Sequence, residues 1–470
     1  MAQADVATPG SKDASTRDGR HTALVDQIGV FARAGAEDDI ARLLDLMLDG
    51  VGVALAGRSS HASRSAETVF EASHTAWDAA WLHGIRMHTL DFDDTHERSL
   101  CHTATALLPG LLALGRDHGR SGRELLDAYD IGIRFVDFAA DCGRALNAAG
   151  AHSTAILGAL SAAAACGWLL THDTEATADA VELAALQAAG LGVAFGSDGK
   201  SLQAARAAEI GVRSALFAAG GLSAPRGAAF GDRGVFALWL GRDAPASVPW
   251  GDDCAGAAAR VAIKPYPSCF LTHSTIDAAL ELRRSLDLRH AGDVRMLHVE
   301  VHPLAEAIAD KTVLGSENAK FSLRFCALAA LVDGRVNVDT FSPEAQRRLT
   351  EDAGSFDAWV AKFAVRTAAA GPQLTARVEV STADGRERRI TVEAPRGSGS
   401  HPLTRDDVIA KFRDDAARDY GDEAVQRLLD EVMAVPSARD IRELGSLMSA
   451  CAPDRGAPDV HAWSANGKRS

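Results

Sequence analysis

Apolar residues recur every three or four positions from about residue 20 to residue 240, with short joints that contain glycine or aspartate. This spacing places apolar side chains on one face of an α-helix, and the joints end one helix before the next begins. The pattern predicts a series of packed helices, of which the clearest are Asp39–Leu55, Leu107–Leu114, Ala155–Leu170, Thr177–Ala194 and Ala204–Ala219.

The pattern changes after Pro265, where alternating runs typical of β-strands replace the helical spacing. Val294–Pro303 alternates between apolar and polar residues and ends in a proline, which suits the end of a strand. Two more alternating runs, Leu374–Val380 and Arg388–Glu393, flank an Asp-Gly pair that favours a tight turn, so they are predicted to form a hairpin. Between the first strand and this hairpin, Ala319–Val332 is predicted to be a core helix.

Helical spacing returns in Arg405–Asp414 and Glu423–Met433. The simplest arrangement is mainly α: a large all-helical domain formed by both chain ends, interrupted by an inserted smaller α+β lid domain. The expected bounds are 20–266 and 403–452 for the helical domain, 267–402 for the lid, and 1–19 and 453–470 for flexible tails. An insert of roughly 130 residues has the size of one domain, and ligand sites favour such junctions.

Composition and charge narrow the class of protein. Hydrophobic residues make up 47% of the 470 residues, which is typical of a globular chain, and the formal charge of −14 argues against a nucleic-acid partner. The most apolar stretch, Ala148–Leu170, contains a histidine and several hydroxyls, so it is predicted to be a buried helix and not a membrane span. The first 20 residues lack the apolar core of a signal peptide, and seven cysteines without a CxxC pair indicate reduced thiols, so we expect a cytoplasmic protein.

Residues 91–102 hold most of the candidate chemistry, because four carboxylates, two histidines, a thiol and two hydroxyls lie within them. Ionisable groups beside a core-forming segment often have perturbed pKa values and often mark functional sites. If Asp91–Thr95 is helical, the two end residues of this segment share one face. His102 could transfer a proton, and the acidic groups could instead hold a divalent metal. An equally weighted alternative is a helix cap followed by a solvated acidic turn.

Three further segments carry candidate residues. His152 opens a very apolar helix, where free backbone N–H groups favour an anion, although a hydrogen-bonded core histidine is the common alternative. Lys200 follows a glycine-rich turn and could clamp a carboxylate, although a single lysine usually lies on the surface. Lys264 lies on a connector stiffened by two prolines at the expected domain boundary, which could equally be a rigid hinge.

In their order and spacing these segments resemble the MmgE/PrpD family over about residues 22–450. The matching pieces are His88–Thr95, Gly150–Thr154, Gly199-Lys200, Lys264–Cys269 and Lys320–Leu323. The resemblance implies a helical domain from both chain ends, a smaller lid, a homodimer, and a site between the domains that uses no cofactor and no metal. It also implies chemistry at a carbon next to a carboxylate of a small di- or tricarboxylate, as in 2-methylcitrate dehydratase.

The family's site, carried over residue by residue, falls on Asp91, Thr95, His102, His152, Lys200 and Lys264. The residues expected to be catalytic are His102, Lys200, Lys264 and Asp91, and those expected to bind substrate are Thr95, His152, Cys269 and Asp94. His102 would be the acid or base, the two lysines would stabilise negative charge on a substrate carboxylate, and Asp91 would orient its partners. The residues expected to form a cap or surface turn are Asp93, His96, Glu97 and Arg98.

The reaction itself is less defined by the sequence. Family members often read Gly-x-His-Pro-Thr where this chain has a serine after His152, and the family's decarboxylases carry a histidine where Cys269 stands. We therefore expect dehydration before epimerisation, and decarboxylation least. Two alternatives of other classes are a metal-dependent cyclase or lyase that uses the acidic cluster and a non-catalytic protein that binds carboxylates.

Overall fold

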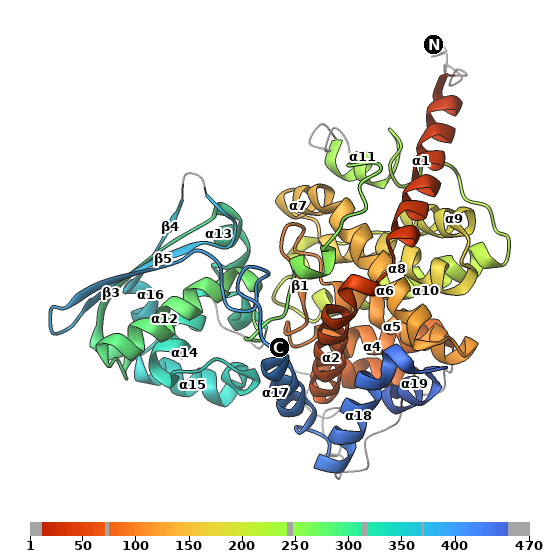
Figure 1. The fold of residues 1–470 in the computed structure, drawn as a ribbon. Helices are drawn as coiled ribbons and strands as arrows, with labels where there is room; N and C mark the ends of the chain where they lie inside the picture. The colour runs from red at the N-terminus through yellow and green to blue at the C-terminus, as the bar shows by residue number, and fades with distance from the viewer. Residues whose placement is uncertain (1–11, 71–74, 242–247, 313–316, 369–370, 450–470) are drawn as a thin grey trace, which may run out of the picture.

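The computed structural model describes residues 12–449 except 71–74, 242–247, 313–316 and 369–370. Most of these residues are helical, so the expected mainly α class is confirmed (Figure 1). Residues 1–11 and 453–470, which belong to the expected tails, lie outside the described residues. Helix α1 (Lys12–Ala34) begins within the expected N-terminal tail, whose flexibility remains a prediction.

The larger part of the molecule is a helical bundle built around one central helix, α8 (Ser153–Thr171). The helices that pack most extensively against α8 are α5 (Thr103–His118), α6 (Gly122–Phe138), α9 (Thr174–Ala185) and α10 (Gly199–Ala219). Its alanine-rich sequence lets neighbouring backbones approach closely. By length and composition α8 could cross a membrane, but 83% of the apolar window is buried inside the protein, as predicted for a core helix.

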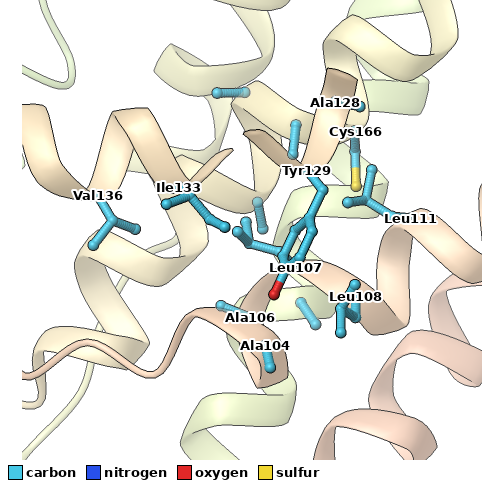
Figure 2. Packing of buried hydrophobic residues seen from close by; sticks show 14 of the residues in the cluster. Ala104, Ala106, Leu107, Leu108, Leu111, Ala128, Tyr129, Ile133, Val136 and Cys166 are labelled. Carbon is cyan, nitrogen blue, oxygen red and sulfur yellow. The ribbon is translucent and has the colours of Figure 1, made fainter. Parts of the chain in front are cut away.

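Figure 2 shows part of this core, where leucines of α5 gather around an aromatic ring of α6. Leu107 and Leu111 lie beside Tyr129, and Cys166 of α8 lies beside the same group. All four side chains are fully buried. The apolar spacing of α5 seen in the sequence is therefore explained by contacts on more than one side of that helix.

The remaining helices of the larger part come from both ends of the chain. They are α2 (Ile40–Ala56), α3 (His61–Phe70), α4 (Ala76–His88), α7 (Ala140–Ala148), α11 (Val235–Leu240), α17 (Arg405–Ala416), α18 (Asp422–Ala434) and α19 (Arg442–Ser449). Helix α17 packs on α2, and α19 packs on α5, so the C-terminal helices complete the bundle that the N-terminal helices begin.

The smaller part is built on a four-stranded sheet in the order β4-β3-β5-β6. Its strands are β3 (Val294–Val301), β4 (Phe363–Thr367), β5 (Ala376–Thr382) and β6 (Glu387–Val392). Strand β3 pairs parallel with β4 and antiparallel with β5, and β5–β6 is the hairpin that the Asp-Gly pair predicted. The helices of this part are α12 (His273–Leu286), α13 (Pro303–Ala309), α14 (Leu323–Asp333), α15 (Pro343–Asp352) and α16 (Phe356–Ala361).

Each of the two parts has its own hydrophobic core. One contains buried residues from 24–263 and again from 403–444, and the other lies within 266–380. Figure 1 shows the sheet and its helices on one side, with the bundle on the other and α17 (blue) between them. Movement of the smaller part as a lid remains a prediction.

Three local expectations are wrong or incomplete. Residues 91–95 form a loop and not a helix, because Asp91 has a left-handed backbone (φ 52°) and a two-residue strand β1 (Thr95–His96) follows. The helix expected to reach Ala194 ends at Ala185, since an irregular segment leads from there to α10. Strand β4 was not expected, because residues 363–367 do not alternate between apolar and polar side chains.

Candidate active site

A cavity of about 400 Å³, counting its opening to solvent, lies where the bundle meets the smaller part. The bundle contributes the loop before α5 and the first residues of α8 and α10, and the smaller part contributes residues 269–271, Ile308 and Phe321. Six of the eight expected site residues line it: Asp91, Thr95, His102, His152, Lys200 and Cys269. Residues more than 170 positions apart in the chain thus meet at one place, at a junction of the kind that ligand sites favour.

Asp91 is the centre of the charged network in this cavity. Its Oδ1 atom accepts hydrogen bonds from Lys200 Nζ at 2.7 Å and from Lys264 Nζ at 3.0 Å, and its backbone oxygen accepts a second bond from Lys264 at 2.8 Å. Burial alone would raise the pKa of Asp91, but the two ammonium groups hold it well below its usual value. The carboxylate is therefore ionised, and one buried anion faces two cations.

Lys264 differs from the expectation in its position. Its side chain is fully buried and does not line the cavity, and both of its hydrogen bonds go to Asp91. The geometry therefore places Lys264 behind Asp91, where it fixes both the carboxylate and the left-handed backbone of that residue. Any effect of Lys264 on a substrate would act through Asp91 and through its own charge.

His102 is the N-cap residue of α5 and presents its ring to the cavity. Its Nε2 atom lies 3.4 Å from Lys200 Nζ and 3.9 Å from Asp91 Oδ1, whereas its Nδ1 atom lies 3.5 Å from Thr95 Oγ1. Burial lowers the pKa of His102 to about 3, because it outweighs the raising effect of Asp93. The imidazole is therefore neutral near pH 7 and can accept a proton.

His152 occupies the corresponding position before α8, and Lys200 is the second residue of α10. Three helices thus begin at the cavity, and their positive dipole ends favour an anion there. Burial, helped by Lys200, holds the pKa of His152 well below its usual value, so this ring is neutral as well. His152 Nδ1 lies 3.2 Å from Gln203 Oε1, and its buried Nε2 atom has no hydrogen-bond partner among the described residues.

Asp93 was expected at the surface, and that prediction is wrong. Its side chain is fully buried, with Oδ2 at 2.8 Å from His88 Nδ1 and at 3.3 Å from His102 Nδ1. Burial would raise the pKa of Asp93, but the two facing imidazoles hold it well below its usual value. The ring of His88 packs edge-on against the ring of His102, with centroids 4.5 Å apart.

Asp94 and His96 also lie elsewhere than expected. Asp94 accepts hydrogen bonds from the backbone N–H of Ala104 and from Thr103 Oγ1, so it caps α5 and does not line the cavity, which gives no support to its expected contact with substrate. His96 was expected at the surface but is fully buried, with Nε2 at 3.0 Å from Asp137 Oδ1. Local sequence patterns could not indicate these contacts, because Thr103 and Ala104 lie nine and ten residues after Asp94 and Asp137 lies 41 residues after His96.

A two-stranded ribbon holds this loop in place. Strand β1 pairs antiparallel with β2 (Val261–Ala262), with Thr95 opposite Ala262. The pairing brings the connector that carries Lys264 against the loop that carries Asp91. Local periodicity could not reveal this ribbon, because each strand has two residues and their separation in sequence is large.

Part of the cavity lining is an apolar wall, and sequence reasoning missed it. Phe195 and Phe321 stack with centroids 6.0 Å apart, and Lys200 Nζ lies 5.5 Å from the centroid of the Phe321 ring. Leu271 and Ile308 complete this wall. The resemblance at Lys320–Leu323 was the one available signal for Phe321. Such a wall excludes water and strengthens the electrostatic interactions beside it.

One group of described residues has the composition and spacing of a metal site. The ligand atoms of His88, Asp93 and His102 lie within 4.8 Å of one another. Two imidazoles and a carboxylate suit several divalent metals. The 2.8 Å between Asp93 Oδ2 and His88 Nδ1 is also a hydrogen-bond distance, and His102 Nδ1 lies 3.3 Å from the same oxygen, whereas Asp93 Oδ1 and His88 Nε2 have no hydrogen-bond partner among the described residues.

Comparison with known proteins also divides the chain into two domains. Residues 32–247 match the sequence model of the MmgE/PrpD N-terminal domain, and residues 266–435 match that of the MmgE/PrpD C-terminal domain. The chain is similar to human cis-aconitate decarboxylase, with 24% identity over 448 residues that cover 88% of this chain and 91% of the relative.

Two further relatives give a similar result. The cis-aconitate decarboxylase of Mus musculus is 25% identical over 464 residues, covering 87% of this chain and 89% of the relative. The cis-aconitate decarboxylase-like protein oryM of Aspergillus oryzae is 26% identical over 453 residues, covering 88% and 93%. Since the two domain models together match most of the chain, the protein belongs to the MmgE/PrpD family.

Proposed function

We propose that this protein is a cofactor-independent lyase that acts at the carbon next to a carboxylate of a small di- or tricarboxylate. The observation that carries the proposal is that His102 lines the cavity with its Nε2 atom 3.4 Å from Lys200 Nζ and 3.9 Å from Asp91 Oδ1, where burial lowers the pKa of the ring to about 3. A neutral imidazole accepts a proton, and an adjacent ammonium group stabilises the negative charge that proton removal creates on the substrate.

The reaction would begin when His102 Nε2 takes the proton from the α-carbon. The electron pair of the broken C–H bond then spreads onto the neighbouring carboxylate, where Lys200 and the dipoles of three helices stabilise it. In dehydration this pair forms the new C=C bond as the hydroxyl on the next carbon leaves. The leaving hydroxyl takes a proton from protonated His102 or from Lys200 and departs as water.

The other groups of the cavity would bind and orient the substrate. Thr95 and His152 line the cavity, where Thr95 Oγ1 and His152 Nε2 would hydrogen-bond a carboxylate or hydroxyl, and Asp91 accepts a hydrogen bond from the ammonium group of Lys200. Burial raises the pKa of the Cys269 thiol to about 11, so this residue would contact substrate as a neutral thiol and not as a nucleophile. The apolar wall would keep water from the developing charge.

Decarboxylation is the second candidate, and the names of the relatives favour it, since both the human and the Mus musculus relative are called cis-aconitate decarboxylase. In that reaction a C–C bond breaks, CO₂ leaves, and the electron pair left on carbon takes up a proton. The first step needs no base. A neutral His102 therefore fits a reaction that starts by removing a proton, such as dehydration or epimerisation, better than one that starts by losing CO₂.

One experiment separates these reactions. The protein is incubated in D₂O with 2-methylcitrate, citrate, cis-aconitate or iminodisuccinate, and each mixture is followed by NMR. Alkene formation from a hydroxy acid supports dehydration, deuterium uptake without a new product supports epimerisation, and loss of CO₂ supports decarboxylation. Turnover that a chelator abolishes would indicate a metal-dependent lyase, and binding without any exchange or product would indicate a carboxylate-binding protein.

Variants then test the assigned residues. His102→Gln is expected to lower kcat at least about 100-fold, the usual minimum contribution of a positioned acid or base. Arg98→Ala is the matched control, because Arg98 lies near the same loop but is half-exposed and pairs with Asp141 outside the cavity. If both variants retain wild-type turnover of the substrate, the assignment of His102 is wrong.

A further inference from the structure

His102 has two ring nitrogens, and the contacts of each nitrogen are chemically different. Nε2 lies 3.4 Å from the ammonium group of Lys200, which can only donate, so Nε2 must present its lone pair. Nδ1 lies 3.3 Å from Asp93 Oδ2, a carboxylate oxygen that can only accept when ionised, and 3.5 Å from the Thr95 hydroxyl, which can accept or donate. A proton on Nδ1 is the arrangement that suits both the Lys200 contact and the Asp93 contact.

The environment of Asp93 keeps this carboxylate available as an acceptor. Its side chain is fully buried, and His88 Nδ1 lies 2.8 Å from the same oxygen that faces His102. His88 is fixed in turn by its position in the last turn of α4 and by ring contacts with His102 and His152. No other carboxylate in the described part of the chain lies within hydrogen-bond distance of His102 Nδ1.

We propose that Asp93 is a positioning residue that holds His102 as the Nδ1–H tautomer and so leaves Nε2 as the proton acceptor toward the cavity. This inference rests on the proposed function of His102 as a base. Asp93 does not line the cavity, so it acts only through His102, with His88 as a second hydrogen-bond donor that fixes the carboxylate. A similar orienting carboxylate behind an imidazole raises ligand or base strength in other sites.

Asp93 is buried but does not line the cavity, so direct contact with a substrate does not explain its presence. A fully buried aspartate costs stability unless its charge is matched, and Asp93 has only two neutral imidazoles as side-chain partners. Its second oxygen, Oδ1, has no hydrogen-bond partner among the described residues. A costly, incompletely paired carboxylate behind the reactive ring is expected where the carboxylate has a functional role.

The direct test is the tautomer of His102 in the wild-type protein without substrate. Protein labelled with ¹⁵N-histidine is examined by long-range ¹H–¹⁵N correlation NMR at pH 7.5, and the His102 signals are assigned by their loss in His102→Gln. A neutral ring protonated at Nδ1 is expected. A ring protonated at Nε2, or a signal that shifts when a chelator is added, would overturn the proposal, the latter because His102 would then be a metal ligand.

The variant Asp93→Asn tests the consequence. An asparagine amide can donate to Nδ1, so we expect the His102 signals to change to the Nε2–H tautomer and kcat to fall at least about 100-fold, with KM changed much less. Asp130→Asn is the matched control, since Asp130 is also a buried aspartate hydrogen-bonded to one side chain, Arg134, but lies outside the cavity. The control should leave both the tautomer and kcat unchanged.

The wild-type spectrum and the Asp93→Asn variant together distinguish an error in the role of Asp93 from an error in the proposed function. An unchanged tautomer and unchanged kcat in Asp93→Asn would overturn the role of Asp93 even if the enzyme is an active lyase. An Nδ1–H tautomer in a wild-type protein that turns over none of the acids would refute the proposed function and leave the positioning of His102 by Asp93 standing. If Asp93→Asn does not fold, the wild-type spectrum alone still decides.

Discussion

Lys264 and Asp91 form a buried ion pair beside the cavity. Lys264 Nζ donates to both the carboxylate and the backbone oxygen of Asp91 and lies too deep to reach a ligand in the cavity. The sequence could indicate that a lysine on a proline-stiffened connector has a function. It could not indicate that Lys264 acts through Asp91, because the burial of Lys264 depends on how the smaller part packs against the bundle.

A double-mutant cycle measures this dependence. Lys264→Met and Asp91→Asn are each expected to lower kcat/KM strongly, but the double variant should be little worse than either one, because both remove the same arrangement. Their coupling in stability is expected to be about 0.5–3 kcal/mol by urea denaturation. The control cycle pairs Lys264→Met with Asp130→Asn and should be additive. Additive losses in the first cycle would mean that Lys264 contacts substrate independently.

His83 gives a residue-scale prediction on pH. Burial, together with the positive charge of nearby arginines, lowers the pKa of His83 from its ordinary value near 6.5 to about 3. Between about pH 3 and pH 6.5 the unfolded chain therefore binds more protons at His83 than the folded chain does. The free energy of unfolding is consequently not reduced by His83 above about pH 6.5, and it decreases as the pH falls below that value. Replacing His83 with glutamine should remove this dependence.

Urea denaturation from pH 4 to 7 tests the prediction by comparing wild type with His83→Gln. The free energy of unfolding of the wild type should fall more steeply toward acid, by up to about 1.4 kcal/mol per pH unit. The difference between the two proteins is the useful quantity, because buried carboxylates with a raised pKa, such as Asp415 at about 7, contribute the opposite slope to both. Parallel curves would contradict a neutral His83 in the folded state.

At the scale of elements, the site depends on how closely α8 and α10 pack, since they carry His152 and Lys200. Gly211 of α10 lies against Ala162 of α8, and a Cβ atom on Gly211 would come within 2.4 Å of the Ala162 Cβ atom. Real atoms do not approach so closely, so a methyl group here must push the two helices apart. The alanine-rich sequence predicted close helices but not which glycine makes the contact.

Gly211→Ala is therefore expected to lower the free energy of unfolding by about 1–3 kcal/mol, the usual cost of overpacking a core. It should also lower kcat/KM, because the start of α10 moves relative to the start of α8. Gly220→Ala at the end of α10 is the control, since Gly220 has an ordinary helical backbone (φ −78°) and its nearest atoms belong to its own helix. Equal stability of the two variants by thermal denaturation would contradict this packing argument.

Most elements could be predicted from the sequence because their apolar spacing is regular, as in α5, α8, β3 and the β5–β6 hairpin. The exceptions have a common physical cause. Strand β4 and the β1–β2 ribbon are stabilised by pairing with distant residues, so their own sequences carry little signal. The sequence left open whether residues 91–95 form a helix, and the loop that they do form is held by Lys264, far along the chain.

At the scale of the whole molecule, the cavity exists only because two parts with separate cores meet. Lys320 is a direct link across this junction: its Nζ atom donates to the backbone oxygen of Thr89 at 3.0 Å and pairs with Glu317 at 2.7 Å. Thr89 lies two residues before Asp91. The side chain of Lys320 is buried, so this link is protected from water and from screening by salt.

We therefore expect Lys320→Met to loosen the junction without unfolding either part. Losing a hydrogen bond from a charged group costs about 1.5 kcal/mol or more, so kcat/KM should fall roughly ten-fold or more, and amide hydrogen exchange near residues 89–91 and 269–271 should become faster. Lys362→Met is the matched control, because Lys362 Nζ donates to the backbone oxygen of Ala291 within the smaller part alone. Equal exchange rates at the cavity in the two variants would show that Lys320 does not hold the parts together, and the smaller part would then have to be held in place by its apolar contacts.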